Sequence, residues 1–193
     1  RDKIDWGRFF SGFSIIAFLT ITTTALDFYY NPENYLIQFE WKSFSIMFLI
    51  AIVFIPLQTS FEEYFFRGYL MQGIGIASRN KWIPLILTSF IFGSLHFFNP
   101  EVDKIGNIAM VYYIGTGFFL GIITLMDEGM ELSLGFHAGT NFIIVLLVTS
   151  DWTVFQTNSI LLDLSDPSKG IEVVLPVFIL YPILLGVMSW KYK

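Results

Sequence analysis

Residues 43–76 read SFSIMFLIAIVFIPLQTSFEEYFFRGYLMQGIGI, an apolar run of 34 residues with three charged side chains near its middle. An α-helix of this length would reach about 51 Å, well beyond the ~30 Å hydrocarbon core of a bilayer. The run therefore predicts a membrane helix that kinks or breaks near Pro56, where an amide hydrogen is missing, or that projects from the membrane.

The whole chain has the composition of a membrane protein. Of its 193 residues, 54% are hydrophobic, 19% aromatic and 14% charged, whereas soluble domains carry about 25% charged residues. Basic residues are few and dispersed and the net charge is -5, so no nucleic-acid surface is expected. The chain contains no cysteine, which excludes disulfides and thiolate chemistry from it. Glutamate and histidine must carry any metal or acid–base chemistry.

Six apolar stretches are near the ~20 residues that a bilayer requires. They cover residues 9–26, 43–76, 82–98, 107–126, 131–149 and 171–190. We therefore predict an all-α fold, a polytopic membrane helix bundle of about six transmembrane helices. A single domain over residues 1–193 is expected, because the length suffices for one bundle and leaves little for a second domain. Segments 27–42, 99–106 and 150–170 are expected to be external loops. Residues 31–41 and 150–170 within them are expected to be plain connectors at the membrane surface, with Trp41 and Trp152 at headgroup depth.

The lysines and arginines predict an orientation. Six spans that start inside place seven basic residues inside and three outside, in agreement with the positive-inside rule. The inner set is Arg1, Lys3, Arg8, Arg79, Lys81, Lys191 and Lys193, and the outer set is Lys42, Lys104 and Lys169. We expect a multi-pass protein of the cell (cytoplasmic) membrane with both its N- and C-termini in the cytoplasm.

The three charges inside the longest run need partners or a task, because a charge within the membrane costs at least ~2.5 kcal/mol. Glu63 and Arg67 are four residues apart with the glutamate first, which is the favourable order for an ion pair on one helical face. Glu62 lies about 100° further round the helix. The spacing predicts that Glu63 and Arg67 neutralise each other and brace the helix, while Glu62 is left free to act.

Both histidines of the chain, His96 and His137, lie in predicted spans. Asn141 shares a helical face with His137, and Phe92 precedes His96 by one turn and is expected to pack beneath it. Glu62 and His96 each lie about 21 Å along their helices from the turn that joins them. These side chains are therefore expected to meet at one level of the membrane.

A glutamate, two imidazoles and an amide suit the attack of water on a carbonyl group. Glu62 could take a proton from water with the help of His96. His137 and Asn141 could then donate hydrogen bonds to the tetrahedral oxyanion. Alternatively, Glu62, His96 and His137 could hold Zn²⁺ with a water in the open position. Both routes end in amide hydrolysis, and the residues alone leave the choice open.

Three short motifs occur in order along the chain: EEYFFRG fits EExxxR, FGSLH fits FxxxH and HAGTN fits HxxxN. Together they resemble the motifs of the CPBP family, the CAAX protease and bacteriocin-processing (Abi) proteins that include type II CAAX prenyl endopeptidases. The resemblance covers about residues 43–149. It implies an intramembrane endopeptidase whose partners are the lipid bilayer and a peptide or membrane-protein substrate.

The resemblance also implies roles for the residues within its motifs. Glu62 and His96 would activate water and His137 and Asn141 would complete the site. Glu63, Arg67 and Phe92 would support them. Members are described both as metalloproteases and as glutamate proteases without a metal, so no cofactor is certain and Zn²⁺ is the candidate.

Two other classes of function compete with the hydrolase. Bacterial relatives are linked to bacteriocin immunity, which leaves a catalytically silent immunity or scaffold protein as one alternative. A proton-coupled transporter is the other, and it would require a polar path that continues across the bilayer. The sequence gives no indication of oligomeric state or of whether a substrate is prenylated.

Overall fold

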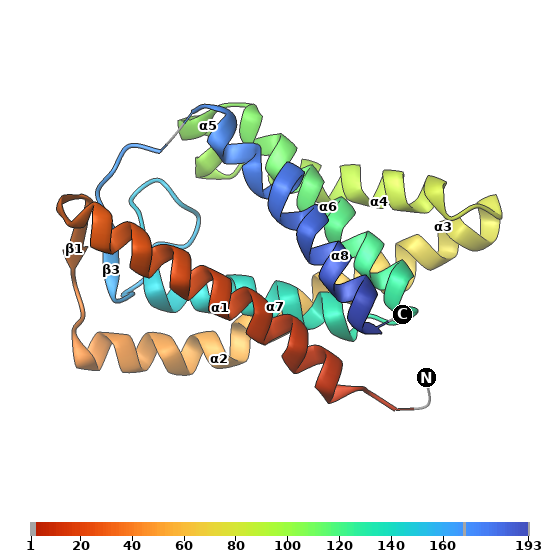
Figure 1. Ribbon diagram of the computed structural model, residues 1–193, viewed down its shortest axis with the longest axis horizontal. Helices are drawn as coiled ribbons and strands as arrows, with labels where there is room; N and C mark the ends of the chain where they lie inside the picture. Colours follow the sequence, from red (N-terminus) through yellow and green to blue (C-terminus); the bar gives the residue numbers. More distant parts are fainter. Residues whose placement is uncertain (1–2, 168, 193) are drawn as a thin grey trace.

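The computed structural model describes residues 3–167 and 169–192, and these are predominantly helical (Figure 1). The all-α prediction is confirmed. The α-helices are α1 (Trp6–Tyr30), α2 (Trp41–Glu63), α3 (Met71–Ser78), α4 (Trp82–Ser94), α5 (Pro100–Ile105), α6 (Ile108–Asp127), α7 (Glu131–Leu147) and α8 (Tyr181–Tyr192). Two π-helical segments, η2 (Tyr64–Leu70) and η4 (Pro176–Leu180), and two 3₁₀ segments, η1 (Pro32–Asn34) and η3 (Ile171–Val174), complete the helical part of the described chain.

Each of the six predicted stretches coincides with helical structure. Four helical runs of the described chain are long and apolar enough to cross a membrane, namely Trp6–Tyr30, Trp41–Ser78, Ile108–Asp127 and Ile171–Tyr192. The other two, α4 with 13 residues and α7 with 17, are shorter. They would reach about 20 and 26 Å, less than the ~30 Å hydrocarbon core. The protein is thus a helical membrane bundle, and the number of six crossings stays a prediction.

The longest helix is not broken at Pro56. α2 continues through this proline to Glu63, and the helix then widens into η2 before it resumes as α3. A break at Pro56, one of the alternatives predicted for this run, is therefore not present, because the loss of one amide hydrogen can be tolerated inside a long membrane helix. Beyond η2, α3 and α4 form a hairpin that extends away from the rest of the bundle (Figure 1).

Carboxylates cap the first turns of two long helices. Asp5 accepts the backbone N–H of Arg8 at 3.1 Å before α1. Glu40 accepts the backbone N–H groups of Lys42 at 3.2 Å and Ser43 at 2.7 Å before α2. Hydrogen bonds from the side chain and backbone of Ser43 and from the N–H of Lys42 lower the pKa of Glu40. An ionised side chain thus satisfies amide groups that a helix start leaves unpaired.

α7 is the central helix and lies between α1 and α2 (Figure 1). On the side of α1, a Cβ atom added to Gly139 would lie only 3.0 Å from the carbonyl oxygen of Phe13, so the two helices are in close contact. On the side of α2, Val145 packs in a buried cluster with Ala51 and Ile55. This close packing brings the helix of His137 within reach of the carboxylates on α2.

α6 packs against α4 with similar closeness. A Cβ atom on Gly117 would lie 2.9 Å from the carbonyl oxygen of Ser89. The far side of α6 joins α1, α7 and α8 in the main hydrophobic core. The buried members of that core are Ile16, Phe119, Leu120, Ile123, Leu132, Phe136, Tyr181, Leu184 and Met188.

The connectors are not plain loops. β1 (Tyr35–Ile37), β2 (Val148–Thr149) and β3 (Leu161–Asp163) form a small sheet in the order β1-β3-β2. β1 pairs with β3 antiparallel and β2 pairs with β3 parallel. The sheet joins segments from both sides of α7, and the third connector contains α5. These strands were not predicted, because strands of two or three residues are too short to show an alternating pattern. That the connectors have no function of their own stays a prediction.

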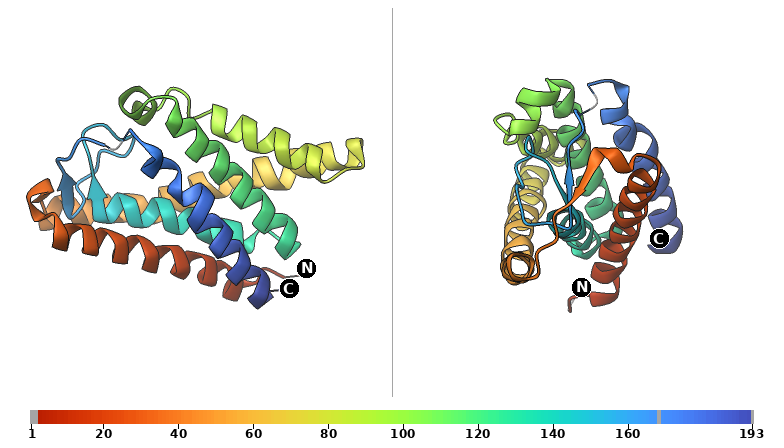
Figure 2. Two further views of the ribbon diagram at one scale, coloured as in Figure 1. Left: turned by 45° about the horizontal axis from the view of Figure 1, so that its top comes forward. Right: turned by 90° about the vertical axis from the view of Figure 1, so that its left-hand side faces the viewer.

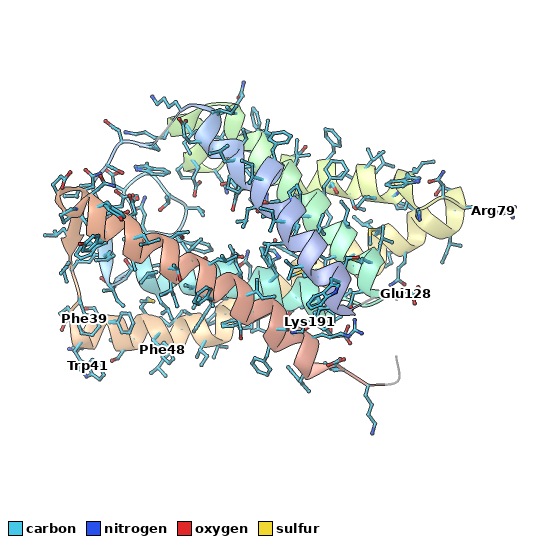
Figure 3. All side chains as sticks on the ribbon, in the orientation of Figure 1. Phe39, Trp41, Phe48, Arg79, Glu128 and Lys191 are labelled. Carbon is cyan, nitrogen blue, oxygen red and sulfur yellow. The ribbon has the colours of Figure 1, made fainter. Side chains whose placement is uncertain are left out.

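Both ends of the chain lie at the same end of the molecule, opposite the small sheet (Figure 2). Lys191 Nζ donates to Ser11 Oγ at 3.0 Å and so joins the last turns of α8 to α1. Figure 3 places Arg79 and Glu128 toward this end, whereas Phe39 and Trp41 lie at the opposite one. This arrangement agrees with the prediction that both termini and the turn at residues 79–81 lie on the same side of the membrane. The assignment of that side to the cytoplasm stays a prediction.

Candidate active site

The predicted ion pair between Glu63 and Arg67 is present and buried. Arg67 Nη1 donates to Glu63 Oε1 at 3.0 Å, and the two side chains are 1% and 0% exposed. Arg67 also donates through Nη2 to the carbonyl oxygen of Gly117 at 3.1 Å. Its guanidinium lies 4.6 Å from the centre of the Phe92 ring. The pair thus ties the end of α2 to both α6 and α4.

The π-helical segment η2 begins at the residue after Glu63. A π-helix has more residues in each turn than an α-helix, so side chains beyond Glu63 are rotated relative to a continuous α-helix. Phe66 and Arg67 are buried in the bundle, whereas Glu62 is only partly buried. Segments of this kind are frequent at functional sites. Here η2 lies where the apolar helix α2 ends and the buried charges of Glu63 and Arg67 begin.

His137 of α7 lies between the two adjacent glutamates. Its Nδ1 is 2.8 Å from Glu63 Oε1, and its Nε2 is 3.7 Å from Glu62 Oε2. A carboxylate only accepts hydrogen bonds, so Nδ1 carries the hydrogen. The Nε2 atom therefore faces Glu62 at a distance slightly too long for a direct hydrogen bond. From the sequence, Glu63 was predicted to pair with Arg67 alone. The contact with His137 could not be predicted, because the two residues lie on different helices and no helical spacing relates them.

The cluster combines the carboxylates of Glu62 and Glu63 with the guanidinium of Arg67 and the imidazole of His137. An uncompensated buried charge is costly, and Arg67 compensates the buried charge of Glu63 directly. The Nε2 atom of His137 is directed toward Glu62.

Asn141 lies one turn beyond His137 on the same helical face, as predicted, and both side chains contact α2. The Nδ2 of Asn141 is 3.5 Å from Gln58 Oε1. Gln58 Nε2 in turn donates to Glu62 Oε1 at 2.6 Å. The structure thus brings Glu62, His137 and Asn141 together. Gln58 lies outside the three sequence motifs and was not predicted, although its spacing of four residues from Glu62 was a usable signal.

His96 lies beyond the end of its helix. The predicted span 82–98 ends earlier, since α4 stops at Ser94. The backbone N–H of His96 donates to the carbonyl oxygen of Gly93 at 3.0 Å in the turn that follows. The apolar residues after His96 extended the hydropathy signal past the point where helical hydrogen bonding stops.

The ring of His96 has a defined tautomer. Its Nδ1 is 2.9 Å from the carbonyl oxygen of Phe92. A carbonyl only accepts, so Nδ1 carries the hydrogen and the lone pair of Nε2 is available. The ring also stacks on Tyr113, with centroids 4.4 Å apart and planes 20° from parallel. His96 is therefore held with its basic nitrogen free.

Phe92 packs beneath His96, as predicted, with ring centroids 5.0 Å apart. The same phenyl ring lies 6.0 Å from the ring of His137. Both histidines thus lie against one aromatic side chain. The hydrogen bond of the His96 ring goes to the Phe92 backbone rather than to Glu62, so the structure places His96 beside the carboxylate cluster without joining it.

The residues suggested for zinc do not form a ligand set. In the described part of the chain, no three His, Asp or Glu side chains lie together in an arrangement that could hold a metal ion. Glu62 and His137 are close, but His96 does not complete a triad with them. A groove of about 310 Å³ occurs elsewhere, between the start of α2 and residues 156–158, and it is lined mainly by aliphatic and amide side chains. It is remote from Glu62 and is not this site.

Fold and site define a polytopic membrane protein with a buried carboxylate–histidine cluster between its helices. The chain belongs to the Rce1-like family of type II CAAX prenyl endopeptidases, because the model of that family matches residues 41–143. The matched segment contains every site residue from Glu62 to Asn141. The resemblance drawn from the three motifs is thereby confirmed.

One curated relative extends this comparison. The chain is 33% identical over 156 residues to an uncharacterized protein, YyaK, of Bacillus subtilis (strain 168). The match covers 80% of this chain and 52% of that protein, so the chain spans about half the length of this relative. No protein of solved structure matches the chain.

Proposed function

We propose that this protein is an intramembrane endopeptidase that hydrolyses a peptide bond of a membrane-associated peptide or protein. The supporting observation is the position of His137, which lies between Glu62 and Glu63 and one turn before Asn141. A carboxylate, an imidazole and an amide thus face one space between α2 and α7. Membership in a family of endopeptidases gives this cluster a reaction to perform.

Glu62 is the general base of the proposed reaction. Its side chain is 22% exposed, whereas that of Glu63 is 0% exposed and is already bound by Arg67 and His137. Glu62 removes a proton from water as the water oxygen bonds to the carbonyl carbon of the substrate. The same proton then passes to the amide nitrogen as the C–N bond breaks. His96, with its free Nε2, orients the attacking water.

The oxyanion of the tetrahedral intermediate is stabilised by His137 and Asn141. The Nε2–H of His137 and the Nδ2–H of Asn141 lie on the same face of α7 and are directed toward α2. Donors that are already oriented stabilise developing negative charge without reorganisation. Glu63 fixes the imidazole through Nδ1, and Arg67 fixes Glu63. These last two residues position the site without touching the substrate.

The decisive experiment is cleavage by the Glu62→Gln variant, which keeps the size of the side chain and removes the base. The family name makes a prenylated CAAX peptide in liposomes the first substrate to test, and an unmodified membrane peptide the second. We expect the rate to fall by about 10²–10⁴-fold while the variant still inserts and folds. Glu128→Gln is the matched control, because this exposed residue lies at the end of α6. Undiminished cleavage by Glu62→Gln would show that Glu62 is not the general base.

The metal scheme is tested separately. The glutamate scheme predicts that purified protein keeps its activity in the presence of a chelator. Inhibition by a chelator that is reversed by added Zn²⁺ would instead favour a metal-dependent reaction and a rearranged set of ligands.

A further inference from the structure

The side-chain amide of Gln58 joins the two helices of the candidate site. Its Nε2 donates to Glu62 Oε1 at 2.6 Å, and its Oε1 accepts from Asn141 Nδ2 at 3.5 Å. Gln58 lies one turn before Glu62 on α2 and is exposed. It lies outside the three motifs that identified the family.

Both contacts require the same orientation of the amide. A carboxylate only accepts hydrogen bonds, so the nitrogen of Gln58 must face Glu62. The carbonyl oxygen of Gln58 then faces Asn141, whose nitrogen donates. Gln58 therefore satisfies an acceptor on α2 and a donor on α7 without any change of its own conformation.

The contact also distinguishes the two oxygens of Glu62. Oε1 is occupied by Gln58, whereas Oε2 is buried and has no hydrogen-bond partner among the residues that the structure describes. Oε2 is also the oxygen that lies 3.7 Å from Nε2 of His137. A buried acceptor without a partner is normally satisfied by water or ligand. Oε2 is therefore the oxygen available to the attacking water.

We propose that Gln58 is a positioning residue for the hydrolysis. Its amide holds Oε1 of Glu62, which leaves Oε2 directed toward His137 and the water, and it links Glu62 to Asn141 across the site. This inference rests on the proposed function. A hydrogen bond between residues four apart would be an ordinary surface contact of a single helix. The second bond, to a residue 83 positions away on α7, makes Gln58 part of the site.

The first test compares two substitutions in the full chain. Gln58→Met has a similar length but neither donates nor accepts, and we expect kcat to fall by about 10- to 100-fold with KM changed by less than about threefold. Gln58→Glu removes the donor and adds a like charge beside Glu62, so its loss should be at least as large. The control is Gln72→Met, on α3 and about 21 Å further along the helix than Gln58. Unchanged kcat in Gln58→Met would overturn the proposal.

A structural role alone predicts a different result. If Gln58 merely stabilised α2, its loss would lower the thermal midpoint and would reduce activity equally in any background. If it acts through Glu62, the midpoint stays within about 2 °C, and Gln58→Met has little further effect on the residual rate of the Glu62→Gln variant. Additive losses in the double variant would contradict the proposal.

The second test needs no substrate. A hydrophobic carbodiimide reacts with accessible carboxyl oxygens, and mass spectrometry locates the product. The amide of Gln58 occupies Oε1 of Glu62 at 2.6 Å, so Gln58→Met frees this oxygen and should increase labelling of Glu62 by about three- to tenfold, with Glu128 as the unchanged reference. His137 and Arg67 accompany Glu62 in both proteins, so the difference reports the contact with Gln58.

These two measurements separate the proposals. Unchanged labelling of Glu62 would overturn the role of Gln58 whether or not a substrate is known. Increased labelling in a protein that cleaves no peptide would support the contact with Glu62 and overturn the proposed function alone.

Discussion

His137 donates through Nδ1 to Oε1 of Glu63 at 2.8 Å, although the two residues are 74 positions apart in the chain. Arg67 binds the same oxygen at 3.0 Å. The ion pair and the histidine are therefore one buried cluster rather than two independent features. Glu63 has two tasks in this arrangement, because it neutralises Arg67 and fixes the imidazole that faces Glu62.

Loss of Glu63 should therefore reduce stability as well as activity. Glu63→Ala leaves a buried guanidinium without its carboxylate, which costs about 3–5 kcal/mol. We expect the thermal midpoint in detergent to fall by roughly 10 °C. The double variant Glu63→Ala/Arg67→Ala should lose less than the sum of the single variants, because neither buried charge is left alone. A midpoint equal to that of the unchanged protein would contradict the ion pair.

Two substitutions of His137 should distinguish the role of its Nδ1 atom from that of its Nε2 atom. Asparagine places a side-chain nitrogen near Nδ1 and can retain the contact with Glu63, whereas glutamine reaches the position of Nε2 and loses that contact. We expect His137→Asn to melt at a higher temperature than His137→Gln, and the rate of His137→Asn to fall by about 10²–10³-fold. Thermal unfolding and a cleavage assay measure the two effects. The reverse order of midpoints would show that Glu63 is not the residue that fixes the ring.

Two glycine substitutions should change stability in opposite directions. A Cβ atom on Gly117 would lie 2.9 Å from the carbonyl oxygen of Ser89, so Gly117→Ala forces α6 away from α4 and costs about 1–3 kcal/mol. The space around Gly73 on α3 is open, with nothing within 4 Å of an added Cβ. Gly73→Ala should therefore stabilise the helix by about 0.5–1 kcal/mol. Thermal midpoints that move in the same direction would contradict the close packing of α6 on α4.

The cap of α2 should depend on pH. Hydrogen bonds from Ser43 and Lys42 lower the pKa of Glu40 below its usual 4.5. The stabilisation is therefore fully present above about pH 4.5 and is lost as the pH falls through the lower value in the folded protein. Glu40→Gln should lower the midpoint by about 2–4 °C near neutral pH, and this difference should disappear once the pH is below the lowered pKa of Glu40, where both side chains are uncharged. Equal midpoints at neutral pH would show that the carboxylate does not stabilise the cap.

Helix positions and the ion pair could be predicted because their causes are local. A run of apolar residues identifies a helix of the membrane without reference to any other segment. The spacing of four between Glu63 and Arg67 places both side chains on one helical face. The same rule correctly placed Asn141 beside His137 and Phe92 beneath His96. The end of α4 before His96 was missed, because hydropathy records apolar character and not the end of helical hydrogen bonding.

The chain itself thus determined that this is a helical membrane protein of the Rce1-like family, and which side chains are the candidates for its proposed chemistry. Only the tertiary structure decided that His137 joins Glu63 as well as Glu62, that Gln58 connects Glu62 to Asn141, and that the connectors pair as a sheet. The contacts between α2 and α7 and the pairing of β1 with β3 join residues 74 to 128 positions apart. Such pairings depend on how closely α7 packs between α1 and α2, and a helix's own periodicity shows only which face it presents, not what will meet that face.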